Sequence, residues 1–159
     1  MTQSNGSDAP LPLHRFLTYR MARVQSKLNT QASRLLRAKA GLSLAQWRIL
    51  ALIGSNPGAR STDLTRISAM DKGQFSRKLK TLVDDRLVTV TMAAEDHRTM
   101  KLELSESGQA LFERTLPHMR ERQMALSSLL APEEEEMFFR VLDRLETAVE
   151  DEAAGGGGR

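Results

Sequence analysis

The sequence predicts a mainly α fold with a small antiparallel β-hairpin, and three observations lead to this fold class. Short amphipathic runs cover Leu44–Ile53, Leu64–Met70 and Phe75–Val83, with apolar residues at helical spacing. Two segments of alternating apolar and polar residues follow at Val88–Met92 and Met100–Leu104, as expected for half-exposed strands. Longer helical patterns flank this centre on both sides.

Length and composition limit the class of protein. The 159 residues fit one compact domain with helical extensions, and 40% of them are hydrophobic, which suffices for a core. The chain has no cysteine, so disulfides and thiolate metal sites are excluded. No apolar stretch has the length of a membrane span, and the polar N-terminus lacks a signal-peptide core. We therefore expect a cytoplasmic protein without membrane contact, metal or cofactor.

Charge is distributed unevenly along the chain, whose formal net charge is +3. Residues 1–40 hold seven Lys and Arg against one Asp, and residues 41–108 hold ten basic and eight acidic residues. Residues 109–159 hold six basic and eleven acidic residues. A basic part of this kind favours nucleic acid as a partner, although many solvated helices show the same pattern.

The N-terminal part is predicted to be disordered over residues 1–12 and then to form a long helix from Leu13 to Lys39. Its apolar residues recur every three or four positions, in a narrow seam of the kind that packs against another helix. Gly41 is expected to end this helix. The seam consists of Leu17, Met21, Val24, Leu28, Ala32 and Leu35.

The helices of the centre begin at recognisable signals. Ser43 and Gln46 form a capping box, in which the serine hydroxyl accepts from the Gln46 amide and the glutamine side chain reaches back. Asn56-Pro57-Gly58 predicts a turn, and Ser61 is expected to cap the next helix. Three compact helices followed by a hairpin form a winged helix-turn-helix, a fold that docks on duplex DNA, and we predict it for residues 41–105.

The third helix of this centre has two distinct faces. Asp71 can cap it at Gln74, and Phe75, Leu79 and Leu82 lie together on the side that packs inward. The opposite face is basic and rich in amide and hydroxyl groups, which hydrogen-bond to base edges in the major groove. That face consists of Gly73, Gln74, Ser76, Arg77 and Lys80. Ordinary surface charge is the alternative, and the hairpin that follows favours DNA.

The hairpin predicts a wing. By alternation, Val88, Val90 and Met92 share one face of the first strand, and Met100, Leu102 and Leu104 share one face of the second. The connection is longer than a tight hairpin needs and carries Asp96-His97-Arg98, so Arg98 is expected near the tip, where it can enter a minor groove. Asp96 can orient that guanidinium by charge-assisted hydrogen bonds. A surface ion pair of little energetic value is the alternative.

Two helices are predicted after the wing. The first covers Glu106–Leu129 and contains Pro117, which should kink it. The second begins at Pro132 and has an acidic first turn, which suits the positive end of the helix dipole. Its apolar stripe consists of Phe138, Val141, Leu142, Leu145 and Val149.

The terminal helices are expected to join two copies of the chain. Their stripes are too narrow to bury themselves within one small chain, so residues 13–40 and 106–150 are predicted to form a helical homodimerisation region. Packing over the centre of the same chain is the alternative. Residues 151–159 are predicted to be a flexible tail.

Several motifs together resemble those of a known family. They are Leu44-Ala45-Gln46-Trp47, Asp71-Lys72-Gly73-Gln74-Phe75-Ser76-Arg77, Asp96-x-Arg98 and Leu102-x-Leu104-Ser105-x-x-Gly108. With them, residues from about 13 to 149 resemble the MarR family of bacterial transcription regulators. The resemblance implies a homodimer on a pseudo-palindromic operator. It also implies a ligand pocket between the dimerisation and DNA-binding parts, often for small aromatic or anionic compounds.

Two positions depart from the family pattern. Arg86 stands where members usually have glycine, and a left-handed conformation there costs on the order of 1 kcal/mol. Either Arg86 accepts this cost, with a phosphate contact in return, or the turn differs. Ala131 stands where a capping hydroxyl is usual, so Pro132 must set the start of the last helix.

We therefore expect a sequence-specific DNA-binding regulator, a ligand-responsive repressor that acts as a homodimer. The expected DNA contacts are Ser61, Thr62, Lys72, Gly73, Gln74, Ser76, Arg77, Lys80, Arg86, Asp96 and Arg98. A small aromatic or anionic ligand is expected in a cleft lined by His14, Tyr19, Arg20, Trp47 and Arg48. The alternative for the last set is that the aromatic residues are core and the arginines are solvated.

Two other functions compete with this one. A winged-helix protein-interaction module would keep the fold without binding DNA, and the basic face of the third helix argues against it. An enzyme is disfavoured, because His14, His97 and His118 are scattered and the sequence has no phosphate loop or nucleophile elbow.

Overall fold

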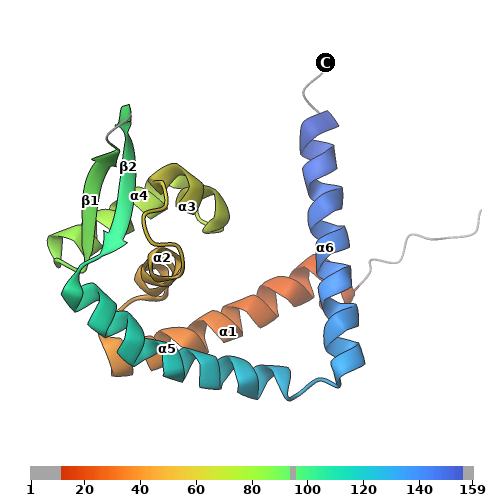
Figure 1. The fold of residues 1–159 in the computed structure, drawn as a ribbon. Coiled ribbons are helices and arrows are strands. Elements are labelled where there is room, and N and C mark those ends of the chain that lie inside the picture. The colour runs from red at the N-terminus through yellow and green to blue at the C-terminus, as the bar shows by residue number, and fades with distance from the viewer. Residues whose placement is uncertain (1–11, 94–95, 156–159) are drawn as a thin grey trace, which may run out of the picture. The chain divides into compact units, whose positions relative to one another are not determined.

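A computed structural model describes residues 12–93 and 96–155, and it confirms the predicted fold class. Over these residues the chain is mostly helical, with one two-stranded antiparallel sheet (Figure 1). In chain order the elements are a 3₁₀ turn at Leu13–Arg15, α1 (Leu17–Ala40), α2 (Leu44–Ser55), α3 (Ser61–Ile67), α4 (Lys72–Asp84), β1 (Val88–Ala93), β2 (Asp96–Leu104), α5 (Glu106–Ser127) and α6 (Pro132–Gly155).

The described chain forms two compact units that meet within α5. The first contains the described residues up to Leu116, and the second begins at Pro117. The first half of α5 belongs to the winged-helix unit because Leu111, Phe112 and Thr115 are buried there. Dimerisation by residues 13–40 and 106–150 stays a prediction. Within the described ranges, no helix is long and apolar enough to cross a membrane.

Helix α6 extends into the residues predicted to form the C-terminal tail. Helix α6 starts at Pro132, as predicted, and continues to Gly155 rather than ending near Glu150. Alanines at 153 and 154 favour helix, which explains the extension. Residues 1–11 and 156–159, which fall within the predicted disordered ends, lie outside the described residues.

The predicted capping signals of α2 and α4 are confirmed. The Gln46 amide donates to Ser43 Oγ over 3.2 Å, and the Ser43 amide donates to Gln46 Oε1 over 3.0 Å. At α4, the Gln74 amide donates to Asp71 Oδ1 over 2.8 Å. These bonds satisfy amides that have no partner within the helix, so both starts are fixed by local sequence. Gly41, with φ of 67°, ends α1 as expected.

The predicted cap of α3 was wrong. Arg60 occupies the N-cap position without a side-chain bond, and Ser61 is the first helical residue. The cause lies outside the helix. Arg60 forms a bridge with Lys101 of β2, and the Leu102 amide donates to the Ala59 carbonyl over 3.1 Å. This pairing with the wing sets where α3 begins.

One apolar core holds the winged-helix unit together. The ring of Trp47 from α2 stacks on Phe112 from α5, with centroids 5.9 Å apart. Phe75, Leu79 and Leu82 of α4 are buried, as the face analysis predicted. Leu36 of α1, Ile49 of α2 and Leu102 of β2 complete the centre with no exposed surface. The core therefore fixes α4 by its inward face and leaves its other face free.

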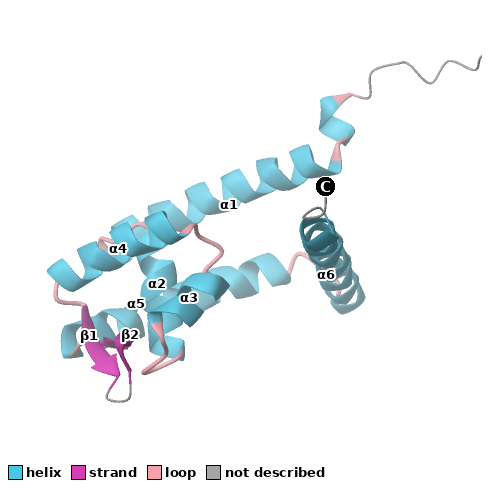
Figure 2. Ribbon diagram, turned by 90° about the horizontal axis from the view of Figure 1, so that it is seen from above, coloured by secondary structure: helices cyan, strands magenta, loops and turns pink. Residues whose placement is uncertain are grey.

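The wing strands are longer than the sequence suggested. Pairing continues from Val88 opposite Leu104 to Ala93 opposite Asp96, with an irregular register after Met92, so only residues 94 and 95 separate the strands. The expectation of a long loop carrying Asp96-His97-Arg98 is therefore wrong, because these residues belong to β2. The charged residues Asp96 and Arg98 made the segment look like a loop in the sequence. Figure 2 shows the hairpin projecting from one end of this unit.

Helix α4, the wing and α5 meet at one hydrogen-bonded junction. Arg86 has a φ of 59°, so it does adopt the left-handed conformation. Ser105 Oγ donates to the Arg86 carbonyl over 2.6 Å and accepts from the Gly108 amide over 3.0 Å. Gly108 packs so closely that an added Cβ would overlap the Leu87 carbonyl oxygen. The Ser105-x-x-Gly108 motif thus closes the wing and starts α5.

Gly108→Ala should destabilise the protein, because its methyl group must displace the backbone of Leu87 rather than a flexible side chain. We expect the free energy of unfolding to fall by about 1–3 kcal/mol or more. Denaturant unfolding measures it, with the exposed neighbour Gln109→Ala as control, which should change stability by less than about 0.5 kcal/mol. Equal stability of the two variants would contradict the close packing.

Candidate nucleic-acid interface

The exposed face of α4 carries the side chains predicted to contact base edges. Ser76, Arg77 and Lys80 are exposed, whereas Gly73 and Gln74 are half-buried. We call these five residues the reading surface. Because Phe75, Leu79 and Leu82 are buried on the other side, α4 has one orientation in which its polar groups can meet a partner. Their donors and acceptors suit the edges of guanine and adenine in a major groove.

The C-terminal part of α4 is held by polar contacts. Lys80 Nζ lies 2.7 Å from Asp84 Oδ2, and both side chains are more than half exposed. Such a surface pair is weak, so Lys80 can exchange this carboxylate for a phosphate at little cost. Gln46 Nε2, at the start of α2, donates to Thr81 Oγ1 over 3.3 Å. The bond between Gln46 and Thr81 therefore holds α4 against α2, and Arg77 and Ser76 take no part in it.

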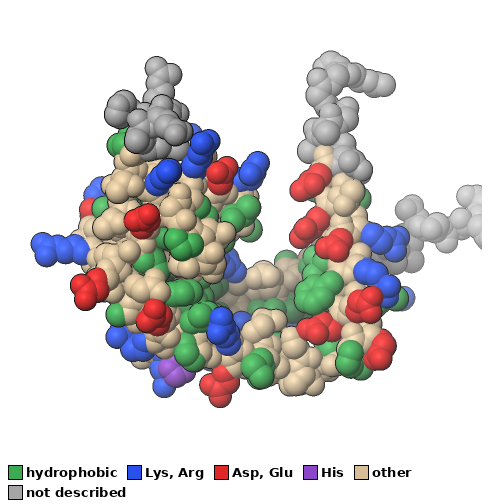
Figure 3. Space-filling model, viewed as in Figure 1, with side chains coloured by type: hydrophobic (Ala, Val, Ile, Leu, Met, Phe, Trp, Pro, Cys, Tyr) green, Lys and Arg blue, Asp and Glu red, His purple; other side chains and the backbone are tan. Residues whose placement is uncertain are grey.

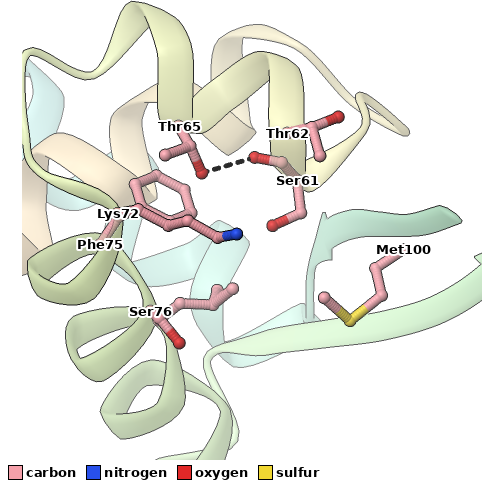
Figure 4. Close-up of a pocket in the computed structure, with 8 residues that line it drawn as sticks. Ser61, Thr62, Thr65, Lys72, Phe75, Ser76 and Met100 are labelled. Atoms are coloured by element: carbon pink, nitrogen blue, oxygen red, sulfur yellow. Dashed lines mark hydrogen bonds between the residues drawn. The ribbon is translucent and has the colours of Figure 1, made fainter. Parts of the chain in front are cut away.

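A recess lies beside the reading surface, between α3, α4 and the wing (Figure 4). Its volume is about 410 Å³. Ser61, Thr62 and Lys72, all predicted DNA contacts, lie at this recess, and the Lys72 amino group extends toward α3 in Figure 4. Thr65 Oγ1 donates to the Ser61 carbonyl over 2.8 Å. The structure thus brings hydroxyls of α3 and an ammonium of α4 to one place.

Some residues of this recess were missed by sequence reasoning. Thr65 lies one helical turn after Ser61, so helical period applied to Ser61 could have found it. Met100 of β2 also lines the recess, and alternation had placed it only on the same face of the strand as Leu102 and Leu104. Beyond Val88 and Leu102, the wing strands no longer pack into the core. Val90, Met92 and Met100 are 39–51% exposed, whereas Val88 and Leu102 are buried.

Two residues of the wing that were predicted to contact DNA are described only by their backbone. The backbone of Asp96 and Arg98 lies in β2, but their side chains lie outside the described residues. The expected bond between them therefore stays a prediction. Arg86, at the entrance to the wing, has an exposed side chain. Its backbone carbonyl is used by Ser105 and by Ser107 Oγ, the latter over 2.9 Å.

The residues predicted to bind a small ligand are divided. Trp47 and Arg48 line a shallow depression of about 320 Å³ together with Ile67 and Ser68. Arg48 Nη2 also donates to Asn29 Oδ1 on α1 over 3.3 Å. His14, Tyr19 and Arg20 lie in the 3₁₀ turn and the first turn of α1, and they do not line this depression.

Basic side chains accumulate at the end of the unit from which the hairpin projects (Figure 3). Lys72, Arg77 and Lys80 of α4 and Lys101 of β2 all have exposed side chains. Within the described ranges, no group of three or more His, Asp or Glu side chains is placed to hold a metal ion. A basic helix face beside a two-stranded wing is the geometry of a winged-helix DNA-binding protein.

Comparison with known proteins agrees with this class. Residues 40–99 match the model of the MarR family. The HTH-type transcriptional regulator BilQ of Clostridium symbiosum is 27% identical over 67% of this chain and 74% of its own length. The HTH-type transcriptional regulator PetP of Rhodobacter capsulatus is 32% identical over 64% of this chain. That match spans 61% of PetP, less than two thirds of its length.

Solved structures show the same fold over most of the chain. A MarR/EmrR family regulator from Acinetobacter sp. ADP1 has a TM-score of 0.82 at 26% identity, covering 89% of this chain and 99% of the other. MepR of S. aureus in complex with DNA has a TM-score of 0.77 at 20% identity, covering 84% and 98%. PcaV of Streptomyces coelicolor with its natural ligand has a TM-score of 0.74 at 17% identity, covering 89% and 99%.

The match over residues 40–99, the two curated regulators and the solved structures support a MarR-family winged-helix regulator. The predicted class of DNA-binding regulator is confirmed, and its relatives are regulators rather than enzymes. Individual DNA contacts stay predictions.

At Arg86, the effect of the left-handed backbone on stability can be measured separately from the effect of the side chain on DNA binding. Arg86→Gly relieves the left-handed backbone, whereas Arg86→Ala keeps it, so the glycine variant should be more stable by about 1 kcal/mol. Both variants lose the guanidinium and should weaken DNA binding equally if it contacts a phosphate. Denaturant unfolding and DNA titration measure the two effects. Equal free energies of unfolding for the two variants would show that the left-handed φ at position 86 does not destabilise the protein.

Proposed function

We propose that this protein is a ligand-responsive repressor that binds a pseudo-palindromic operator as a homodimer. Each copy would place α4 in a major groove and its wing in the neighbouring minor groove. The observation that carries this proposal is the reading surface, an exposed polar face on a helix whose other face is buried. The DNA complex of MepR, which shares the fold, supports DNA as the partner.

The expected contacts divide into two kinds by chemistry. Arg77 and Gln74 can form bidentate hydrogen bonds to guanine and adenine respectively, and Ser76 can bond to either. Ser61, Thr62 and Lys72 at the recess, with Lys80 and Arg86, are suited to phosphates, because hydroxyl and cationic groups bond to the backbone without regard to sequence. The first kind would set specificity and the second would set position.

Exposed apolar residues support a homodimer. In α1, Leu17, Met21 and Val24 are 41–54% exposed within their own unit. Helix α6 exposes a stripe as well, and its apolar side chains are visible in Figure 3. The exposed residues of α6 are Met137, Phe138, Phe139, Val141 and Val149. Apolar surface of this extent on one chain is characteristic of an interface with another chain.

A small ligand is proposed to control the distance between the two DNA-binding units. The depression at Trp47 and Arg48 has the cation of Arg48 at its wall, which suits an anionic compound, whereas the Trp47 ring is 6% exposed and stacks on Phe112. PcaV, which shares the fold, is known with its natural ligand bound. A ligand that binds one arrangement of the dimer more tightly would shift the population able to bind DNA.

DNA binding should weaken steeply as salt rises, because bound phosphates release counterions. Arg98→Ala should weaken binding and reduce the slope of log affinity against log salt by about one unit. Titrations of a labelled genomic fragment, selected by binding, measure both effects. Glu113→Ala, on the exposed side of α5, serves as control. No binding at low salt would support a protein-interaction module, and an unchanged slope would remove Arg98 from the interface.

Phe138→Glu should shift the protein from dimer to monomer, because it places a charge in the apolar stripe of α6. Sedimentation over a dilution series measures the shift, which should exceed a tenfold rise in the dissociation constant, or about 1.4 kcal/mol. Arg140→Glu adds the same side chain and breaks a weak pair with Glu136 at 3.7 Å. Equal assembly of both variants would exclude this stripe from the interface.

A further inference from the structure

The first turn of α4 has no side chain at position 73, and the guanidinium of Arg77 lies over the vacant place. A Cβ atom added to Gly73 would lie 3.0 Å from Nη1 of Arg77 and 3.8 Å from its Cζ. Arg77 is one turn further along the helix, so its long side chain folds back toward the N-terminus of α4 rather than extending outward. Gly73 thus gives room to the arginine of the reading surface.

The carboxylate of Asp71 lies at the same place. The added Cβ would be 3.2 Å from Asp71 Oδ1, so this oxygen and Nη1 of Arg77 are within roughly 6 Å of each other, close enough for attraction. The same oxygen caps α4 by accepting from the Gln74 amide over 2.8 Å. The positive end of the helix dipole would repel a guanidinium here. The negative charge of Asp71 opposes that repulsion.

We propose that Gly73 is a specificity-determining residue that acts by positioning Arg77. The absence of a side chain at 73, together with the charge of Asp71, holds the guanidinium at the N-terminal end of the reading surface and so selects the base pair it reaches. This inference rests on the proposed function, in which α4 lies in a major groove. Gly73 is a positioning residue, since it acts through Arg77.

Gly73→Ala is a clean perturbation of this arrangement. The atoms in its way are the far end of the flexible Arg77 side chain and the Asp71 carboxylate, so the helix backbone need not move. Alanine also favours helix more than glycine does, so the variant should fold at least as well. Asp71→Asn is a second perturbation. Asparagine caps helices as well as aspartate, so this variant removes the charge and keeps the cap.

The test measures base preference on a genomic fragment selected by binding to the parent protein. Each base pair of the bound region is replaced in turn, and affinities are measured for the parent, Gly73→Ala, Asp71→Asn, Arg77→Ala and Gly73→Ala/Arg77→Ala. Arg77→Ala should reduce preference at one base pair by roughly tenfold. Gly73→Ala and Asp71→Asn should each change preference at that same base pair by at least about threefold. Affinity for unrelated DNA is measured for each variant in parallel, so that a change in phosphate attraction is separated from a change in base preference.

The double variant decides whether Gly73 acts through Arg77. If it does, adding Gly73→Ala to Arg77→Ala changes preference no further. An unchanged preference in Gly73→Ala, or an equal further change in the double variant, overturns the inference while leaving the reading surface intact. If Arg77→Ala itself has no effect at any base pair, the proposed role of α4 fails instead. Denaturant unfolding of each variant shows that the differences do not come from loss of fold.

Discussion

The hydrogen bonds of Ser105 are the constraint on which the winged-helix unit depends. Its hydroxyl donates to the Arg86 carbonyl and accepts from the Gly108 amide, so one side chain joins the turn after α4 to the start of α5. The Ser105 amide also donates to the Leu87 carbonyl over 3.1 Å. The end of α4, both wing strands and α5 are therefore connected within a few residues. A close approach that needs glycine at 108 completes the junction.

This junction gives the unit its functional geometry. A wing and a recognition helix can contact neighbouring grooves together only if the angle between them is fixed. Here the angle is fixed twice, by the junction at Arg86 and by the pairing of Arg60 with Lys101 on the other side of the wing. Leu79 and Phe75 have a double role, since they fill the core and also form the floor of the recess. The packing of these two residues therefore determines both the core and the shape of the recess.

Features that depend on residues close together in the sequence were predictable, whereas features that depend on contacts between distant residues were not. The caps at Ser43 and Asp71 depend on residues three apart, and the inward face of α4 follows from helical period, so both were predicted correctly. The start of α3 was misplaced because Lys101, forty residues away in the chain, determines it. The extent of the wing was underestimated because strand pairing, not residue type, holds Asp96 opposite Ala93. The position of Arg77 over Gly73 depends on side-chain direction, which the spacing of residues alone does not specify.

We propose that two copies of the winged-helix unit bind DNA side by side. Hydroxyl-radical footprinting of a genomic fragment selected by binding tests this arrangement. We expect two related patches of protection about one helical turn apart, each extending from a major groove into the neighbouring minor groove. A single patch, or two patches without minor-groove protection, would contradict it.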